Sequence, residues 1–141
     1  MNEEKNFGIA EAWSRRATCP RASVGCVIVM EDSRIVTGGY NGAPEGQPTC
    51  LTDGCIIEGG HCVRAVHAEM RAVAYAARHG YALDRTTAFL TLLPCMNCLN
   101  ALCLCGVTTI YYDKSYEREE REYVLLLAKR AGVRLIERTR E

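Results

Sequence analysis

Four side chains in this sequence could together hold a zinc ion and use it for hydrolysis. Glu69 follows His67 by two residues, and Cys95 and Cys98 lie 28 and 31 residues after the histidine. Three protein ligands leave the fourth tetrahedral position open, which is typical of a catalytic zinc. Zinc lowers the pKa of a bound water from about 15.7 to roughly 7, so hydroxide becomes available at neutral pH. Glu69 is close enough in sequence to take a proton from that water and pass it on.

The combined pattern is more specific than its parts. A lone Cys-x-x-Cys is weak, but His-x-Glu followed by Pro-Cys-x-x-Cys, here starting at Pro94, is the signature of zinc-dependent nucleobase deaminases. The alternative is a structural zinc clip in a binding module. Such a clip would need a fourth ligand and would leave Glu69 without a role. We therefore expect His67, Cys95 and Cys98 to hold a catalytic zinc.

Hydrophobic periodicity predicts which elements must position these residues. We expect a helix over 5–17, an antiparallel hairpin of strands 23–30 and 34–40, a helix over 65–78, a strand over 86–92, a helix over 95–105, a strand over 107–112, a helix over 117–131 and a strand over 133–136. Both metal motifs then fall in the first turn of a helix. This order predicts an α/β fold, a three-layer α-β-α sandwich with a mixed five-stranded sheet, as a single domain over residues 1–141.

Composition limits the classes of partner. The 141 residues are 48% hydrophobic, and 17 basic residues balance 17 acidic ones. Zero net charge argues against stable nucleic acid binding, which usually needs a basic excess. The apolar runs are far too short to span a membrane, and the polar, acidic start lacks the features of a signal peptide. We expect a cytoplasmic protein.

Nine cysteines are more than one zinc ion can use. The Gly/Pro-rich connection over 41–66 contains Cys50, Cys55 and Cys62 with His61, and Cys19 precedes the first strand. These could be ordinary thiols, but a long polar connection has little else to fix it, and zinc can contribute on the order of 10 kcal/mol of ordering energy. We expect a second, structural zinc here, with His61 as the alternate to Cys62. The remaining cysteines, at 26, 103 and 105, are predicted to lie in the core.

Several stretches resemble the cytidine deaminase-like superfamily, and within it the deoxycytidylate (dCMP) deaminases of the late-competence-operon type. The matching residues are 17–21, 24–25, 39–44, 50, 54–55, 61–70 and 94–98. The resemblance implies hydrolysis of dCMP to dUMP and ammonia, in which Glu69 moves the proton to N3 and then to the leaving amine. It also supports the second zinc. Arg71 departs from the resemblance, because such proteins usually carry Asn at this position.

The resemblance further implies a homo-oligomer, a hexamer or a dimer, in some members regulated by dCTP or dTTP, with Mg²⁺ accompanying such a nucleotide. For substrate binding we expect Arg21 and Asn41 to contact phosphate or sugar, although Asn41 could be only a turn residue and Arg21 only a surface charge. The other expected contacts are Gly42, Ala68, Pro94 and Tyr116, the last closing over the phosphate. The alternative functions are deamination of another nucleobase-containing substrate and a non-catalytic, zinc-stabilised oligomeric module.

Overall fold

The computed structural model describes residues 1–140. Within them the chain forms, in order, α1 (Glu3–Ser14), β1 (Gly25–Val29), β2 (Ile35–Tyr40), α2 (Cys50–Asp53), β3 (Ile57–Glu58), β4 (His61–Cys62), α3 (Ala68–His79), β5 (Thr87–Leu92), α4 (Met96–Leu104), β6 (Thr109–Lys114), α5 (Glu120–Ala131) and β7 (Arg134–Glu137). None of the helices in this part of the chain has the length and apolar character needed to cross a membrane.

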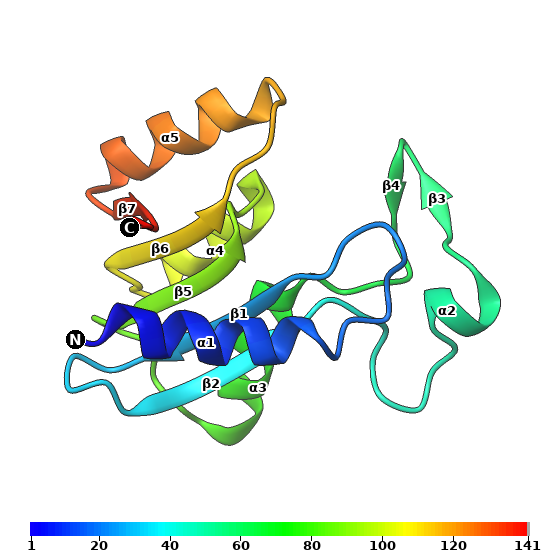
Figure 1. Ribbon diagram of the computed structural model, residues 1–141, viewed down its shortest axis with the longest axis horizontal. Helices are drawn as coiled ribbons and strands as arrows, with labels where there is room; N and C mark the ends of the chain where they lie inside the picture. Colours follow the sequence, from blue (N-terminus) through cyan, green and yellow to red (C-terminus); the bar gives the residue numbers. More distant parts are fainter. Residues whose placement is uncertain (141) are drawn as a thin grey trace.

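The main sheet has five strands in the order β2-β1-β5-β6-β7. β1 runs antiparallel to both β2 and β5, whereas β6 runs parallel to β5 and β7. Helix α1 covers one face of the sheet, and α3, α4 and α5 pack on the other (Figure 1). The predicted α/β fold, a three-layer sandwich around a mixed five-stranded sheet, is confirmed.

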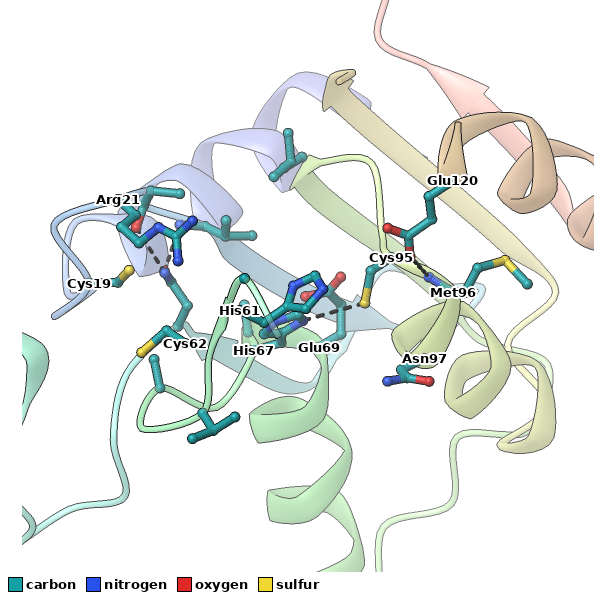
Figure 2. A pocket seen from close by; sticks show the side chains of 18 of the residues that line it. Cys19, Arg21, His61, Cys62, His67, Glu69, Cys95, Met96, Asn97 and Glu120 are labelled. Carbon is teal, nitrogen blue, oxygen red and sulfur yellow. Dashed lines mark hydrogen bonds between the residues drawn. The ribbon is translucent and has the colours of Figure 1, made fainter. Parts of the chain in front are cut away.

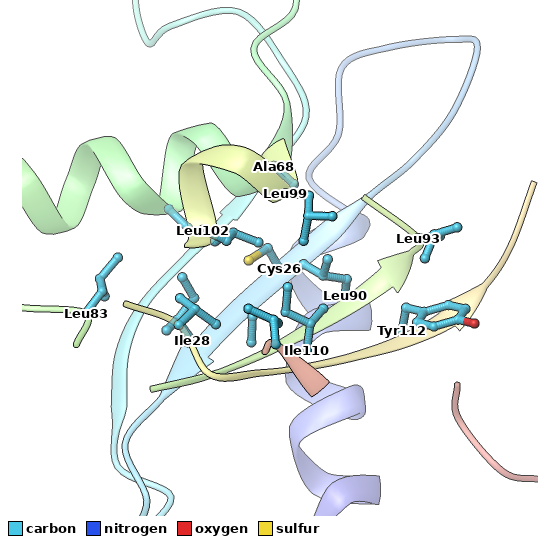
Figure 3. Close-up of a cluster of buried hydrophobic side chains, with 14 of the residues drawn as sticks. Cys26, Ile28, Ala68, Leu83, Leu90, Leu93, Leu99, Leu102, Ile110 and Tyr112 are labelled. Carbon is cyan, nitrogen blue, oxygen red and sulfur yellow. The ribbon is translucent and has the colours of Figure 1, made fainter. Parts of the chain in front are cut away.

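The larger core lies between the sheet and α3, α4 and α5 (Figure 3). Alternate residues of the central strands point into it, among them Ile28, Leu90 and Ile110, and meet Leu99 and Leu102 from α4. All five side chains are fully buried. Burying such side chains contributes about 1.5–3 kcal/mol each, so α4 is fixed firmly against the sheet.

The opposite face has a smaller core under α1. Phe7 packs edge-on against Phe89, with 5.3 Å between the ring centroids, and Phe89 stacks on Tyr111 at 4.8 Å. Val27 and Val29 from β1 complete this cluster. Both faces of β1 are therefore covered, which explains why its sequence is apolar throughout rather than alternating.

Helix boundaries differ from the prediction in an instructive way. α1 begins at Glu3 because the Asn2 side chain accepts a hydrogen bond from the Lys5 backbone N–H at 3.1 Å, an N-cap that the apolar pattern does not reveal. His67 and Cys95 are not in the first turns of α3 and α4 but are their N-cap residues. The last helix begins at Glu120, three residues later than predicted.

The connection over 41–66 is more ordered than a plain loop. It contains the short helix α2 and the two-stranded hairpin β3–β4, and it projects away from the sheet (Figure 1). Of the three cysteines predicted to lie in the core, Cys26 is fully buried, as predicted. Cys103 and Cys105 are only partly buried at the end of α4, where they pack against the edge of the larger core.

Candidate active site

His67, Cys95 and Cys98 form a compact group of potential zinc ligands (Figure 2). The His67 Nδ1 atom lies 3.5 Å from Cys95 Sγ and 3.4 Å from Cys98 Sγ. In a tetrahedral zinc site with bonds of about 2.3 Å to sulfur and 2.0–2.1 Å to nitrogen, neighbouring ligand atoms are about 3.6 Å apart. The observed separations and the Cys₂His donor set therefore fit zinc.

Two helix N-termini bring these ligands together. His67 and Cys95 have extended backbone at the N-cap positions, and neither side chain caps its own helix, so both remain free for a metal. Cys98 lies in the first turn of α4 and is buried. The Met96 backbone N–H, one of the N–H groups left unpaired at the start of α4, donates to Glu120 Oε2 at 2.8 Å.

The surroundings of the His67, Cys95 and Cys98 group favour a negatively charged thiolate on one of its two sulfurs. Hydrogen bonds from Cys98 and His67 lower the pKa of the Cys95 thiol to about 4. The hydrogen bond to Cys95 raises the pKa of Cys98 and, together with burial, keeps it protonated in the metal-free chain. The Cys95 contact also raises the pKa of His67. Zinc binds thiolates, so metal binding would release the remaining thiol proton.

Glu69 lies beside this group, in the first turn of α3, and only 4% of its surface is exposed. Burial raises the pKa of its carboxyl to about 7, and the charge of His67 acts in the opposite direction. A pKa near ambient pH suits a group that must take up and release protons. Glu69 and His67 face the same pocket (Figure 2).

The pocket has a volume of about 760 Å³, which is within the range of small-molecule sites. Of the predicted site residues, the pocket is lined by Cys19, Arg21, Asn41, His61, Cys62, His67, Ala68, Glu69 and Cys95. Gly42, Pro94 and Tyr116, which were predicted to bind substrate, do not line it. Arg21 is exposed and, within residues 1–140, forms no hydrogen bond or ion pair, so its guanidinium is available to a ligand.

The side-chain amide of Asn41 is already engaged by backbone groups. Its Oδ1 accepts from the Val24 N–H at 2.8 Å, and its Nδ2 donates to the Ala22 carbonyl at 2.8 Å. Asn41 is also buried. It therefore holds the segment that contains Arg21, in addition to lining the pocket, and is not the plain turn residue of the alternative interpretation.

Tyr116 and Gly42 support the site from outside the pocket. The Tyr116 hydroxyl donates to the Pro94 carbonyl at 2.9 Å, next to Cys95, which differs from the predicted closure over a phosphate. Gly42 exchanges two backbone hydrogen bonds with Val66, at 3.0 and 2.9 Å, and so fixes the chain just before His67. Burial raises the pKa of Tyr116 to about 12, so it remains a hydrogen-bond donor at neutral pH.

Among the pocket residues that were not predicted are two charged residues at or just before the start of α5. Arg118 and Glu120 line the pocket, whereas both were predicted to lie within a helix over 117–131, without a role in the site. The chain is not helical at Arg118, and its guanidinium stacks on the Tyr116 ring at 4.2 Å and lies 3.7 Å from a Glu120 oxygen. Nothing in the spacing of charged residues along the sequence indicated that Arg118 would stack on Tyr116.

A second group of potential metal ligands consists of Cys50, Cys55 and Cys62. The Cys50 and Cys62 sulfurs are 3.5 Å apart, and all three sulfurs lie within 4.8 Å of one another. Backbone N–H groups, that of Ala65 foremost, lower the pKa of Cys62 to about 6, whereas burial raises that of Cys50 to about 12.

Two residues predicted for the second metal lie elsewhere in the structure. Neither Cys19 nor His61 belongs to the three-cysteine group; both line the pocket (Figure 2). His61 is exposed on β4, the strand that also carries Cys62. Cys62 lines the pocket as well as joining the sulfur group, whereas His61 lines the pocket only.

Comparison with known proteins identifies the family. Residues 1–114 match the family described as "Cytidine and deoxycytidylate deaminase zinc-binding region". ComE operon protein 2 of Bacillus subtilis is 38% identical over 118 residues, covering 84% of this chain and 61% of that protein. Deoxycytidylate deaminase of Mycobacterium phage D29 is 36% identical over 124 residues, covering 79% of this chain and 94% of that protein.

The solved structures agree. The dCMP deaminase of cyanophage S-TIM5, solved in complex with dCMP and dUMP, superposes with a TM-score of 0.81 and 28% identity over 96% of each chain. Its apo form gives a TM-score of 0.79. The family match covers both halves of the zinc-ligand pattern, from His67 to Cys98, and the fold agrees along almost the whole chain. By its sequence, its fold and its group of zinc ligands, this chain belongs to the family of cytidine and deoxycytidylate deaminases.

Proposed function

We propose that this chain is a zinc-dependent deaminase of cytosine nucleotides that converts dCMP and water to dUMP and ammonia, as a single domain over residues 1–141. One observation carries the proposal: His67, Cys95 and Cys98 converge at the wall of a pocket of about 760 Å³, beside the buried carboxyl of Glu69. A closed structural zinc site would have no use for that carboxyl. The phage relatives named as deoxycytidylate deaminases support dCMP as the substrate.

The residues divide the chemical work. His67, Cys95 and Cys98 would hold the zinc, which supplies the Lewis acidity that makes water nucleophilic at neutral pH. Glu69 takes a proton from the attacking water and delivers it to N3 of cytosine. It then takes the proton of the hydroxyl that has been added to C4 and passes it to the amine, so that the bond from C4 to nitrogen breaks, ammonia leaves and the C4 carbonyl of uracil forms. Arg21 and Arg118 supply positive charge to the pocket wall, where they can bind the phosphate.

The experiment is ammonia release measured side by side from dCMP, deoxycytidine, CMP and dCTP. We expect dCMP to be turned over and deoxycytidine to react poorly, because it lacks the phosphate. Glu69→Gln keeps the shape of the side chain but cannot accept the proton, so we expect kcat to fall by about 10²–10⁴ with zinc retained. Activity on none of the four substrates, from zinc-loaded protein, would contradict the proposal and favour another nucleobase substrate or a non-catalytic role.

A second zinc at Cys50, Cys55 and Cys62 is part of the proposal. The three sulfurs lie close together in a projecting segment that contributes no residue to either of the two apolar cores described above, and a shared metal ion would hold such a segment in place. We expect two zinc ions per chain by elemental analysis. Cys98→Ser should leave one zinc and no activity, whereas Cys62→Ser should leave one zinc and measurable activity. A count of one zinc in the wild type would remove this part of the proposal.

We also propose a homo-oligomer in the cytoplasm. The projecting segment exposes Leu51, Ile57 and Val63 to more than half of their possible extent, which is unusual for a surface that stays in water. Light scattering on the purified protein would decide between a monomer, a dimer and a hexamer. Mg²⁺ bound with a regulatory nucleotide stays a prediction from the family resemblance.

A further inference from the structure

Arg71 is almost completely buried, with 5% of its side chain exposed, but the carboxylate that it pairs with is on the surface. Its partner Glu45 has 61% of its side chain exposed. The other acceptors are backbone carbonyl oxygens at 2.9, 2.8 and 2.7 Å, those of Tyr40, Gly42 and Ala43. A buried cation is costly unless its donors are paired, and here four hydrogen bonds do so.

The fork geometry of Arg71 binds one short turn. Its Nε atom donates to the Tyr40 carbonyl and its Nη2 atom to those of Gly42 and Ala43. The guanidinium also lies over the Tyr40 ring, 4.1 Å from its centroid. α3 can come this close to β2 because Gly39 has no side chain; a Cβ there would be 2.5 Å from the Ala68 carbonyl oxygen. Residues 40–45 are thereby fixed to the helix that carries Glu69.

Residues 40–45 also hold one wall of the pocket in place. The Asn41 carbonyl accepts from the Thr18 N–H at 3.1 Å, and the Asn41 side chain binds the backbone of Ala22 and Val24. The segment 18–24 between these contacts carries Arg21 into the pocket. It lies outside the regular secondary structure and depends on such contacts for its position.

The zinc ligands do not depend on Arg71 in the same way. The chain before His67 is fixed by the two hydrogen bonds between Gly42 and Val66, which remain possible without a guanidinium. Cys95 and Cys98 lie on α4, which packs on α3 through the core. Arg71 meets a zinc ligand only through its backbone: its N–H donates to the His67 carbonyl at 3.0 Å, a helical hydrogen bond that a side-chain substitution leaves in place.

We propose that Arg71 is a positioning residue for substrate recognition: by fixing residues 40–45 it sets the pocket wall that carries Arg21, and so the affinity for the phosphate of the substrate. The proposal rests on the proposed function for the identity of that substrate. It assigns Arg71 to binding and not to the chemical step.

The test compares Arg71→Met and Arg71→Lys with the control Glu45→Gln, measuring kcat and KM for dCMP and deoxycytidine. For Arg71→Met we expect KM for dCMP to rise about tenfold or more with kcat within about threefold, because ground-state and transition-state binding are lost together. An ammonium group cannot reach three carbonyls in fork geometry, so Arg71→Lys should rescue only in part. Glu45→Gln should change KM by less than about twofold, since surface ion pairs contribute little.

Three results would overturn the proposal. An unchanged KM in both Arg71 variants would show that the wall keeps its position without Arg71. A fall in kcat at constant KM would place Arg71 in the chemical step. An effect of Glu45→Gln equal to that of Arg71→Met would make the surface ion pair, and not the carbonyl contacts, responsible.

Hydrogen exchange separates this proposal from the proposed function. In Arg71→Met the Thr18 and Val24 amides should exchange about tenfold faster or more, whereas the Leu99 amide on α4 should keep its wild-type rate. If the wild type fails to deaminate dCMP, the proposed function falls, and exchange still decides whether Arg71 holds this wall. If exchange at these amides is unchanged, the positioning role is wrong. Should Arg71→Met not fold, Arg71→Lys is judged by the same two measurements.

Discussion

At the scale of single residues, burial and charge act on Glu69 in opposite directions. Desolvation raises the pKa of its carboxyl from the ordinary 4.5 to about 7, while His67 favours the charged form. In the metal-free chain the folded state therefore binds a proton more tightly than the unfolded state does. Stability is then highest below the unfolded pKa and is lost as pH rises through the folded one.

We expect this linkage to be measurable by urea unfolding of the chelator-treated protein. Between pH 5 and 8 the wild type should lose about 2–3 kcal/mol of stability relative to Glu69→Gln, whose side chain does not titrate. Parallel pH profiles for the two proteins would show that the carboxyl is not destabilised by burial. The comparison with Glu69→Gln cancels the contributions of titrating groups that do not interact with Glu69.

Tyr116 offers a second test at this scale. Tyr116→Phe removes the hydroxyl that donates to the Pro94 carbonyl, which lies beside Cys95. Loss of one such hydrogen bond should cost about 1 kcal/mol, seen as a lower thermal midpoint. Because the hydroxyl points to the backbone, KM for dCMP should stay within about twofold. A large rise in KM with unchanged stability would instead support closure of Tyr116 over the phosphate.

At this scale the sequence predicted the zinc ligands and the proton-transferring carboxyl better than the residues that surround and position them. His67, Glu69, Cys95 and Cys98 could be recognised because zinc chemistry demands particular side chains at short spacings. The role of Arg118 in the pocket could not be recognised, because its position depends on where α5 begins and on stacking with Tyr116. The backbone partners of Asn41, at Ala22 and Val24, could not be predicted either, because they lie 17 to 19 residues away in the chain.

At the scale of elements, the helices and main strands could be predicted because their apolar periodicities are long and regular. Their ends were less certain, since ends are set by single hydrogen bonds such as the Asn2 cap of α1. The segments α2, β3 and β4 were not predicted. Each has four residues or fewer, too short for a periodic signal, and their order comes from the sulfur group and its surrounding turns.

The close packing of α3 on β2 predicts unequal effects of two glycine substitutions. A Cβ at Gly39 would meet the Ala68 carbonyl oxygen at 2.5 Å, whereas a Cβ at Gly8 on α1 would meet nothing within 4 Å. Gly39→Ala should therefore destabilise the protein by about 1–3 kcal/mol and weaken activity, because Ala68 precedes Glu69. Gly8→Ala should stabilise it by up to about 1 kcal/mol through helix propensity. Chemical denaturation of both variants measures the difference, and equal effects would contradict the close approach.

At the scale of the whole molecule, one arginine joins the two ends of the chain. Arg138, just after β7, binds Glu4 on α1 through Nη2 at 2.8 Å and through Nε at 3.2 Å. Its other contacts are with Glu11 at 3.2 Å and Asp113 at 3.5 Å, and it lies over the Phe7 ring. Only 9% of its side chain is exposed, so these contacts are screened less than surface pairs.

Arg138→Met should cost about 1–3 kcal/mol, since Glu4 and Glu11 lose their partner and the packing on Phe7 is lost. Asp113 keeps its ion pair with Arg140. Arg34→Met is the matched control, because Arg34 pairs with Asp32 where both side chains are more than half exposed. That change should stay within about 0.5 kcal/mol. Urea unfolding at low and high salt measures both. If the two variants behaved alike, Arg138 would be an ordinary surface charge.

The contact between Arg138 and Glu4 brings the first helix and the last strand close enough for a circular permutation of the chain. The start of α1 and the end of β7 lie at one end of the molecule, and the projecting segment of α2, β3 and β4 lies at the other (Figure 1). A short glycine-rich linker could join the termini, and new ends could be opened in the exposed turn at Asp32 and Ser33, between β1 and β2. Such a circular permutant would keep all five strands of the main sheet and both groups of potential zinc ligands. It should therefore refold and bind zinc as the unpermuted chain does.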